Sequence, residues 1–475
     1  MPTYFIGIDN GSQSSKVVVF DVAGRIVAEG RQALRPNHTP CPGVVEHPDD
    51  DLWDSIGAAS RQAMDAFPGD PSEIAGVGLC TIRFCRAMLK ADGTLAQPVL
   101  SWMDARVSRP YPDHDPRVAH VTTSSGYISA RMTGVFADTA ANYQGMWPMD
   151  TDRWQWHEPG PAFDACGYPR EKLFDLVMPG DLLGHVTAAA SAHTGIPEGV
   201  PVYATSNDKA VEALGCGLRD PRDVLVSLGT YIAGMAVGEA NLSGVEHFWT
   251  NFGCQPHQYL YESNGIRRGM WTVSWLRDLL GREVTEGAAE RGVSVEDYLN
   301  LEAAKVPCGS DGLMVVLDWL APTDAVHRKG AFVGFDGRQG RLHLYRAVLE
   351  GIAMTMANKV QLMAAELGVE FGRVIVSGGG SNSDLMMSIM ADCFGTPAVR
   401  MELNNAASLG AAICAAVGSG AYAGFDAAID AMVRPAATFA PDQANRETYA
   451  KLREILPGIA QDLDRTNRLI YSVAG

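Results

Sequence analysis

The sequence predicts an α/β protein of two domains. The chain has 475 residues, which is too long for one ordinary hydrophobic core. Apolar strand patterns alternate with helical patterns, as they do in layered α/β architectures. A strand–turn–strand pattern opens the chain and recurs at residues 224–237, so each half begins with the same kind of unit. We therefore expect one domain at residues 1–225 and a second at residues 226–475.

The first strand–turn–strand unit spans residues 4–21. Its first strand carries Asp9 near its end, and its polar turn consists of Asn10, Gly11, Ser12, Gln13 and Ser14. Gly11 lets the backbone approach a ligand closely, and the turn can direct N–H and O–H donors at an anion. Asp9 can hold a hydrated cation beside that anion. The pattern indicates a nucleotide phosphate with Mg²⁺, and an ordinary polar hairpin is the alternative.

The second unit places Gly229 and Thr230 in a turn between two apolar strands. Two such turns, one at the start of each half, predict a duplicated fold with a nucleotide between the copies. The likeness between the halves is in pattern and not in residue identity.

The remaining elements continue the alternation. In the first half the patterns predict helices at 49–66, 127–133 and 210–217 and strands at 74–80, 87–99 (with a turn at 91–93) and 201–205. In the second half they predict helices at 269–280, 342–367, 384–393, 407–417 and 443–467. Residues 147–163, with three Trp and three Pro, are expected to form a folded loop or cap.

Composition excludes several classes of function. The net charge is −17 and no block of Lys or Arg stands out, so neither nucleic acid nor an anionic membrane is expected as a partner. The nine cysteines are scattered and form no C-x-x-C, which is typical of reduced thiols in a cytoplasmic protein. No zinc motif and no secretory signal are recognised. Oligomeric state cannot be read from the sequence, and a homodimer is one open alternative.

Asp208 is the candidate catalytic residue. The sequence contains no G-x-x-x-x-G-K-[ST] motif, so phosphate binding by a P-loop is excluded. Asp208 follows the strand pattern PVYAT and precedes a helical pattern, and at such a junction helix N-terminal donors face a ligand. Phosphoryl transfer needs a base for the attacking hydroxyl, and Asp208 can supply it. A helix N-cap is the alternative. The adjacent Lys209 can pair with Asp208, contact a substrate hydroxyl or point to solvent.

A glycine-rich turn at residues 378–383 separates a strand pattern from a helix. Such a unit lets the backbone pass close to a flat or anionic ligand. Gly379, Gly380 and Ser383 are therefore candidate nucleotide-binding residues, and a tight structural turn is the alternative.

Taken in order, these segments resemble the FGGY family of carbohydrate kinases, within the wider actin, Hsp70 and sugar-kinase fold. The motifs that carry the resemblance cover nearly the whole chain: GIDNGSQSSK, WMDAR, SNDKAVEALGCGL, SLGT, RKGAFVGF, RAVLEGIA, VSGGGSNSDLMMSIMADCFGTPA and ASLGAAICAAVGSG. The resemblance implies two actin-like (ribonuclease H-like) domains with an ATP cleft between them. It also implies ATP with Mg²⁺, a proton-accepting role for Asp208, and packing of residues 378–383 against adenine and ribose.

The acceptor site is where this chain departs most from the family. Arg83 and Phe84 align with residue pairs that contact the sugar in relatives, and only Arg83 can bond a hydroxyl. Asp104 matches a family Asp that contacts substrate hydroxyls, and an internal salt bridge with Arg106 is the alternative. Position 209, which often carries Asn or Gln in relatives, is Lys here. The segment after Arg106 is short, and LDWLAP at 317–322 replaces G-E-R-x-P.

The resemblance therefore implies an ATP-dependent kinase of a small sugar or polyol. A ketopentose such as xylulose or ribulose is the first expectation, and a tetritol, pentitol or glycerol-like polyol is the second. An ATPase that uses the same fold for a conformational cycle is the alternative from a different class. Asp208 and the WMDAR segment argue against that alternative.

Overall fold

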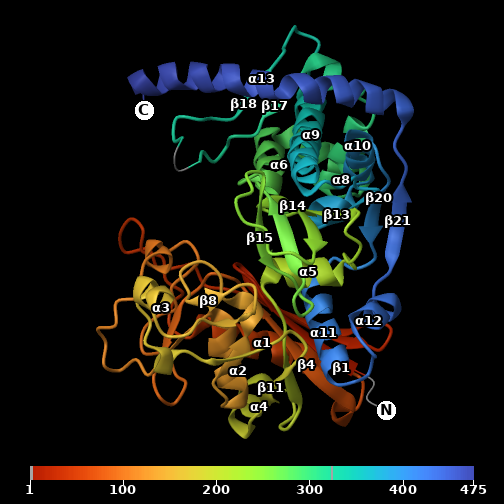
Figure 1. Ribbon diagram of the computed structural model, residues 1–475. Helices are drawn as coiled ribbons and strands as arrows, with labels where there is room; N and C mark the ends of the chain where they lie inside the picture. Colours follow the sequence, from red (N-terminus) through yellow and green to blue (C-terminus); the bar gives the residue numbers. More distant parts are fainter. Residues whose placement is uncertain (1–3, 323–324, 475) are drawn as a thin grey trace.

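Two large mixed β-sheets organise the molecule (Figure 1). The computed structural model describes residues 4–322 and 325–474. The first sheet has the strand order β11 (Leu182–His185), β12 (Pro201–Ala204), β4 (Ile74–Thr81), β1 (Tyr4–Asn10), β2 (Ser14–Asp21) and β3 (Ile26–Ala33). The second has the order β15 (Phe248–Phe252), β16 (Tyr259–Ser263), β14 (Ile232–Gly238), β13 (Asp223–Leu228), β19 (Arg373–Ser377), β20 (Ala398–Met401) and β21 (Pro435–Phe439).

The two sheets repeat one connectivity. In the first, β1 pairs antiparallel with β2, β2 pairs antiparallel with β3, and β1–β4 and β4–β12 are parallel. In the second, β13 pairs antiparallel with β14, β14 pairs antiparallel with β16, and β13–β19 and β19–β20 are parallel. The duplication predicted from the two strand–turn–strand units is therefore present in the topology.

Helices cover both sheets. The first half contains α1 (Asp51–Ala66), α2 (Ser124–Thr133), α3 (Pro161–Cys166), α4 (Ala188–Thr194) and α5 (Asp208–Gly215). The second contains α6 (Gly269–Leu279), α7 (Arg282–Arg291), α8 (Val295–Ala303), α9 (Arg341–Leu367), α10 (Asp384–Phe394), α11 (Ala406–Gly418), α12 (Phe425–Met432) and α13 (Gln443–Ala474). None of the helices in the described part of the chain combines the length and apolar character of a bilayer-spanning segment.

Short elements complete the structure. The two-stranded sheets pair β5 (Ala87–Leu89) with β6 (His120–Thr122), β7 (Ala137–Thr139) with β10 (Asp175–Val177), β8 (Met149–Asp150) with β9 (Gln155–Trp156), and β17 (Met314–Val316) with β18 (Ala331–Val333). The 3₁₀ helices are at Pro71–Glu73, Ala105–Ser108, Ala140–Asn142, Arg170–Lys172, Ser310–Gly312 and Gly379–Asn382. The predicted cap at 147–163 is folded around β8, β9 and the start of α3.

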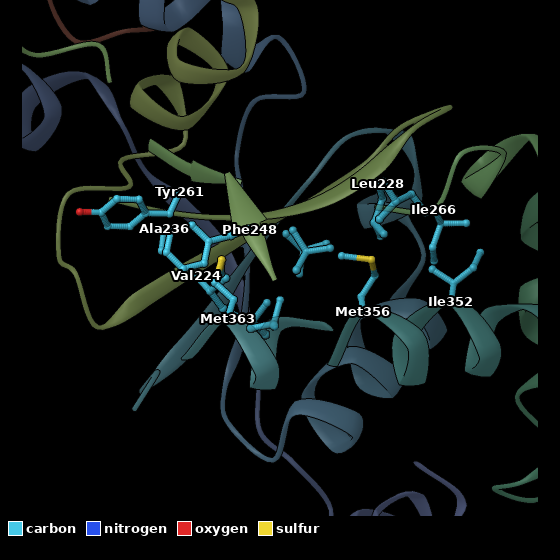
Figure 2. Close-up of a cluster of buried hydrophobic side chains, with 14 of the residues drawn as sticks. Val224, Leu228, Ala236, Phe248, Tyr261, Ile266, Ile352, Met356 and Met363 are labelled. Carbon is cyan, nitrogen blue, oxygen red and sulfur yellow. The ribbon is translucent and has the colours of Figure 1, made fainter. Parts of the chain in front are cut away.

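The long helix α9 forms the core of the second half with β13, β14 and their neighbours. Figure 2 shows Met356 and Met363 of this helix among buried side chains of the sheet, including Val224 and Phe248. A Cβ at Gly234 would lie only 2.5 Å from Val360, so the glycine lets the helix lie against the strand. Burying side chains of this size contributes about 1.5–3 kcal/mol each to stability. This packing supports β13 and β14 and therefore the turn between them, at Gly229 and Thr230.

Helix α11 belongs to the second half by sequence but packs on the first sheet (Figure 1). A Cβ at Gly7 would come within 1.8 Å of the Ser408 carbonyl oxygen, and one at Gly78 within 1.8 Å of the Ala411 carbonyl oxygen. The helix also crosses α5 at Gly215, where an added Cβ would meet the Ala406 carbonyl at 1.8 Å. Small residues therefore let α11 fix both the first sheet and the helix that begins at Asp208.

The predicted domain boundary, between residues 225 and 226, lies inside β13 (Asp223–Leu228). The chain passes from α5 to the second sheet through residues 216–222. Because a strand in the middle of a sheet cannot be divided between two domains, we propose the division just before Asp223, with α11 and α12 returning to the first half.

Candidate active site

Asp208 is the first residue of α5, at the place where the two halves of the chain meet. The helix is capped by Asn207, whose side-chain oxygen accepts a hydrogen bond from the backbone N–H of Ala210 at 3.1 Å. Asp208 is therefore not the N-cap, and that alternative from the sequence is wrong. Its side chain is 30% exposed, so its carboxylate can meet a ligand.

Arg83 links Asp208 to the second sheet. The Nε atom of Arg83 lies 3.4 Å from Oδ1 of Asp208. Its two terminal nitrogens donate to Glu262 on β16, at 2.9 Å and 3.0 Å. The guanidinium also lies over the ring of Phe84, 5.2 Å from the ring centre, and over that of Trp249, at 4.9 Å. The structure thus brings the predicted residues Arg83, Phe84 and Asp208 together.

The backbone at Phe84 has a φ of 63°, which is uncommon for a large side chain. Strain of this kind persists where the surrounding structure fixes it, and it often marks functional sites. The conformation supports the assignment of the segment after β4 to the site.

Lys209 is directed to Glu212 and not to Asp208. Its Nζ donates to Glu212 at 2.9 Å and to Ser227 at 3.1 Å. Glu212 in turn accepts hydrogen bonds from Ser227 on β13 at 2.7 Å and from Ser377 on β19 at 2.6 Å. The Lys209 side chain therefore neither pairs with Asp208 nor points to solvent. The network joins α5 to two strands of the second sheet, and a contact of Lys209 with substrate stays a prediction.

Two carboxylates of the site, those of Asp208 and Asp9, have raised pKa values. Burial raises the pKa of Asp208, and the positive charges of Arg83 and Lys209 oppose that rise. Burial also raises the pKa of Asp9 to about 6, against the opposing charge of Lys16. A carboxyl group with a raised pKa holds a proton more readily, as a general base must when it accepts one.

The first turn divides into residues that build it and residues that face outward. Asn10 donates to Ser15 at 2.7 Å, and the backbone N–H of Gly11 bonds the Ser14 carbonyl at 3.1 Å. The Ser14 hydroxyl accepts a hydrogen bond from Arg31 at 3.3 Å. Ser12 and Gln13 are exposed. The Oδ1 atom of Asn10 is buried and has no hydrogen-bond partner among the described residues.

The second turn and the glycine-rich turn line one pocket of about 350 Å³. Gly229 and Thr230 come from the first of these turns, and Gly379 and Gly380 from the other. An added Cβ at Gly379 would meet no atom within 4 Å, so this backbone faces open space. Ser383 instead caps α10, since its hydroxyl accepts a hydrogen bond from the backbone N–H of Met386 at 3.1 Å. Four of the predicted nucleotide-binding residues thus share a pocket, and Ser383 has a structural contact.

Asp104 belongs to a separate network. Its carboxylate accepts hydrogen bonds from the backbone N–H of Val45 at 2.8 Å and from the Arg106 guanidinium at 2.6 and 2.9 Å. Burial raises the pKa of Asp104, but these donors outweigh it and hold the pKa below its usual value. Arg106 also bonds Glu46 at 2.7 Å. None of these contacts reaches Asp208 or Arg83, so the geometry is that of an internal salt bridge.

Asp9 suits a Mg²⁺ ion that keeps most of its water ligands better than a metal ion held by several protein side chains. Within residues 4–322 and 325–474, no group of three or more His, Cys, Asp or Glu side chains is arranged to hold a metal. Asp9 offers one buried carboxylate with a raised pKa. Mg²⁺ commonly keeps several waters and takes one or two carboxylates plus substrate phosphates, so a single carboxylate suits it.

The N-terminal domain of the FGGY family of carbohydrate kinases matches residues 4–111 and 107–215, and the C-terminal domain of the same family matches residues 224–419. The chain is 47% identical over 467 residues to the uncharacterized sugar kinase YgcE of Escherichia coli (strain K12), covering 98% of this chain and 94% of that protein.

Solved structures share the fold. A xylulose kinase from Rhodospirillum rubrum has a TM-score of 0.82 and 24% identity, over 98% of this chain and 99% of that one. A gluconate kinase from Lactobacillus acidophilus has a TM-score of 0.82 and 18% identity, over 98% and 99% of the two chains. The two actin-like domains expected from the sequence are the fold of these neighbours.

Proposed function

The chain belongs to the FGGY family of carbohydrate kinases, and we propose that it transfers the γ-phosphoryl group of ATP to a hydroxyl of a small sugar or polyol, with Asp208 as the general base. The kinase activity follows from the family. The observation that carries the role of Asp208 is its place in the first turn of α5, where Asn207 caps the helix and the Asp208 carboxylate lies beside Arg83.

In this reaction the acceptor hydroxyl oxygen attacks the γ-phosphorus and the bond from that phosphorus to the β–γ bridging oxygen breaks, which releases ADP. Asp208 accepts the proton of the attacking hydroxyl. Arg83 lies next to that carboxylate and can donate a hydrogen bond to the acceptor. Removing one proton acceptor of this kind typically costs about 10²–10⁴-fold in rate.

The nucleotide is proposed to occupy the pocket formed by Gly229, Thr230, Gly379 and Gly380. Its phosphates would then extend to the first turn, where Ser12 and Gln13 are exposed. Asp9 would hold Mg²⁺, which supplies positive charge to the phosphates during transfer. Asn10 and Ser14 are proposed to shape this turn rather than to bind directly, since both are engaged in internal hydrogen bonds.

A ketopentose such as xylulose or ribulose is our first proposal for the acceptor, and a tetritol, pentitol or glycerol-like polyol is the second. The name of the Rhodospirillum rubrum relative, a xylulose kinase, supports the ketopentose. Phe84 and Trp249 supply apolar surface beside Arg83 and suit the carbon chain of such an acceptor.

The test is ADP release, coupled to a spectroscopic assay, over a panel of ketopentoses, pentitols, tetritols and glycerol with ATP and Mg²⁺. Stimulation of ADP release by one of these acceptors, with a phosphorylated product detected by mass spectrometry, is expected. Failure of every acceptor to raise ADP release above the rate with ATP alone would overturn the proposal. A homodimer is a separate proposal, which light scattering on the eluted protein tests.

A further inference from the structure

We propose that Glu262 is a positioning and specificity-determining residue, which holds Arg83 beside Asp208 and makes the acceptor site select uncharged polyols over sugar acids. The inference rests on the proposed function and extends it to a substrate class. Sequence patterns did not single out Glu262, which follows the apolar and aromatic residues 259–261 in the strand YLYES.

The first step of the argument is the geometry of the ion pair. Both carboxylate oxygens of Glu262 bond Arg83, at 2.9 Å and 3.0 Å, and the Glu262 side chain is 1% exposed. A bidentate pair fixes the plane of a guanidinium as well as its position. The remaining nitrogen of the guanidinium, Nε, lies 3.4 Å from Oδ1 of Asp208. Glu262 therefore sets the orientation in which Arg83 meets the catalytic centre.

The second step concerns the two halves. Arg83 follows β4 of the first sheet, whereas Glu262 lies on β16 of the second, so the pair joins residues 179 positions apart. The acceptor-side arginine is thus held by the half that carries the nucleotide pocket. Its placement depends on the relative position of both halves.

The third step concerns what Arg83 can still bind. A free guanidinium fork at a sugar site matches the carboxylate of a sugar acid in bidentate geometry. Here Glu262 already occupies that fork. The N–H groups left over can donate single hydrogen bonds, which suit hydroxyl groups. A sugar acid would have to displace a buried carboxylate or enter without a partner for its charge, and an unpaired buried charge is costly.

The fourth step is the charge around Asp208. The charged groups that act on Asp208 are Arg83, Lys209, Glu262 and Glu212, and Asp9 of β1 also interacts with it, next to Lys16 of β2. When all are ionised, four carboxylates stand against three cations, and the complex of Mg²⁺ with ATP that the proposed function places here is itself negatively charged. An incoming carboxylate meets net negative charge in a partly buried site, where charges interact more strongly than in water. The surroundings therefore favour an uncharged acceptor.

The experiment compares wild type with Glu262→Gln, which removes the charge, and Glu262→Asp, which keeps the charge but shortens the reach to Arg83. The acceptors are the best neutral acceptor of the panel and gluconate as a sugar acid. The control is Asp223→Asn, which also removes the charge of a buried carboxylate. Asp223 is the first residue of β13, at the end of that strand away from the turn at Gly229, and it pairs with Arg373 of β19. KM for each acceptor, KM for ATP and the pH profile of kcat/KM are measured for all four proteins.

For wild type we expect turnover of the neutral acceptor and at least about 100-fold lower kcat/KM with gluconate, as expected when a buried charge finds no partner. Both Glu262 variants should raise KM for the neutral acceptor about 10-fold or more, because neither keeps the bidentate ion pair that orients Arg83, and KM for ATP should change little. Glu262→Gln should reduce the ratio of kcat/KM for the neutral acceptor to kcat/KM for gluconate. Glu262→Asp should leave this ratio unchanged.

The pH profile separates this role from a purely structural one. The charge of Glu262 helps to raise the pKa of Asp208, although burial is the larger cause and Arg83 opposes both. A base works only when it is deprotonated, so activity is lost as pH falls through its pKa. Removing the charge of Glu262 lowers that pKa, and the acid limb should move to lower pH in Glu262→Gln but not in Glu262→Asp or Asp223→Asn.

Several outcomes would overturn the inference. Turnover of gluconate by wild type at the same kcat/KM as the neutral acceptor would refute the selectivity and leave the kinase function intact. Equal behaviour of Glu262→Gln and Asp223→Asn in KM and pH profile would refute the positioning role. Should Glu262→Gln fail to fold, an unchanged acceptor KM in Glu262→Asp would refute it equally. No turnover of any acceptor by wild type would overturn the proposed function itself, and this inference with it.

Discussion

The side chain of Asn207, and not that of the next residue, Asp208, is the N-cap of α5, and the Asp208 carboxylate accepts a hydrogen bond from the backbone N–H of Lys209 at 3.0 Å. The cap bond runs from the backbone N–H of Ala210 to the Asn207 side-chain oxygen at 3.1 Å. Asn207 also donates to the Phe252 carbonyl of the second half at 3.0 Å. Asn207 therefore both begins α5 and joins the start of this helix to the other half of the chain. Asp208 is then the next residue and is directed to the site.

The first prediction concerns the base. Asp208→Asn keeps the size of the side chain and removes its ability to accept a proton, so kcat should fall about 10²–10⁴-fold. The Kd for ATP should stay near the wild-type value, because Asp208 lies outside the nucleotide pocket. Steady-state kinetics and calorimetric titration measure the two quantities. Asp220→Asn, a change at a surface carboxylate paired with Arg222, is the control and should alter neither. Near-normal turnover of Asp208→Asn would disprove the assignment.

The second prediction concerns the nucleotide pocket. Gly379 lines the pocket, and a Cβ there would meet no neighbouring atom, so Gly379→Val should place a side chain in the pocket without disturbing the fold. We expect ATP binding to weaken by about 1–3 kcal/mol, which is the usual cost of overfilling a packed space, while KM for the acceptor stays unchanged. Gly458→Val, at an exposed glycine of α13 with equally open surroundings, is the matched control. An unchanged KM for ATP would argue for a purely structural turn.

The third prediction concerns Asp104. Asp104→Ala leaves the backbone N–H of Val45 without its partner and leaves Arg106 with Glu46 alone, so the free energy of unfolding should fall by about 1–3 kcal/mol. Urea denaturation measures this loss. Asp115→Ala removes a surface partner of Arg117 and should leave the urea midpoint close to that of wild type. A rise in KM for the acceptor alone, without loss of stability, would instead support the substrate contact that the family resemblance implies.

The fourth prediction concerns closure of the two halves. The first turn belongs to one half, and the turn at Gly229 and Thr230 belongs to the other, so a competent position for the γ-phosphate needs both. Closure would also exclude water and limit wasteful hydrolysis of ATP. Small-angle X-ray scattering should show a smaller radius of gyration with nucleotide and acceptor bound than without ligands. An identical radius in both states would count against closure.

Much of the fold was predictable from the sequence. The strands at 4–10 and 14–21, the junction before Asp208 and the long helix α9 all have local apolar periods or breaker residues that mark them. The prediction was incomplete at α7 and α8, whose sequence, 282–303, is rich in charge and has a weak apolar stripe. Helix α13 also continues seven residues past its predicted end at 467.

The sequence by itself determined which residue types were available at each turn, because a turn and a helix start depend on residues that are neighbours along the chain. Only the tertiary structure decided how they are paired. Arg83 meets Glu262 across 179 positions, and Lys209 is drawn to Glu212 because Ser227 and Ser377 of the second sheet complete that carboxylate's hydrogen bonds. Such contacts depend on where two separately folded sheets are placed by α5 and α11, and no local pattern records that placement.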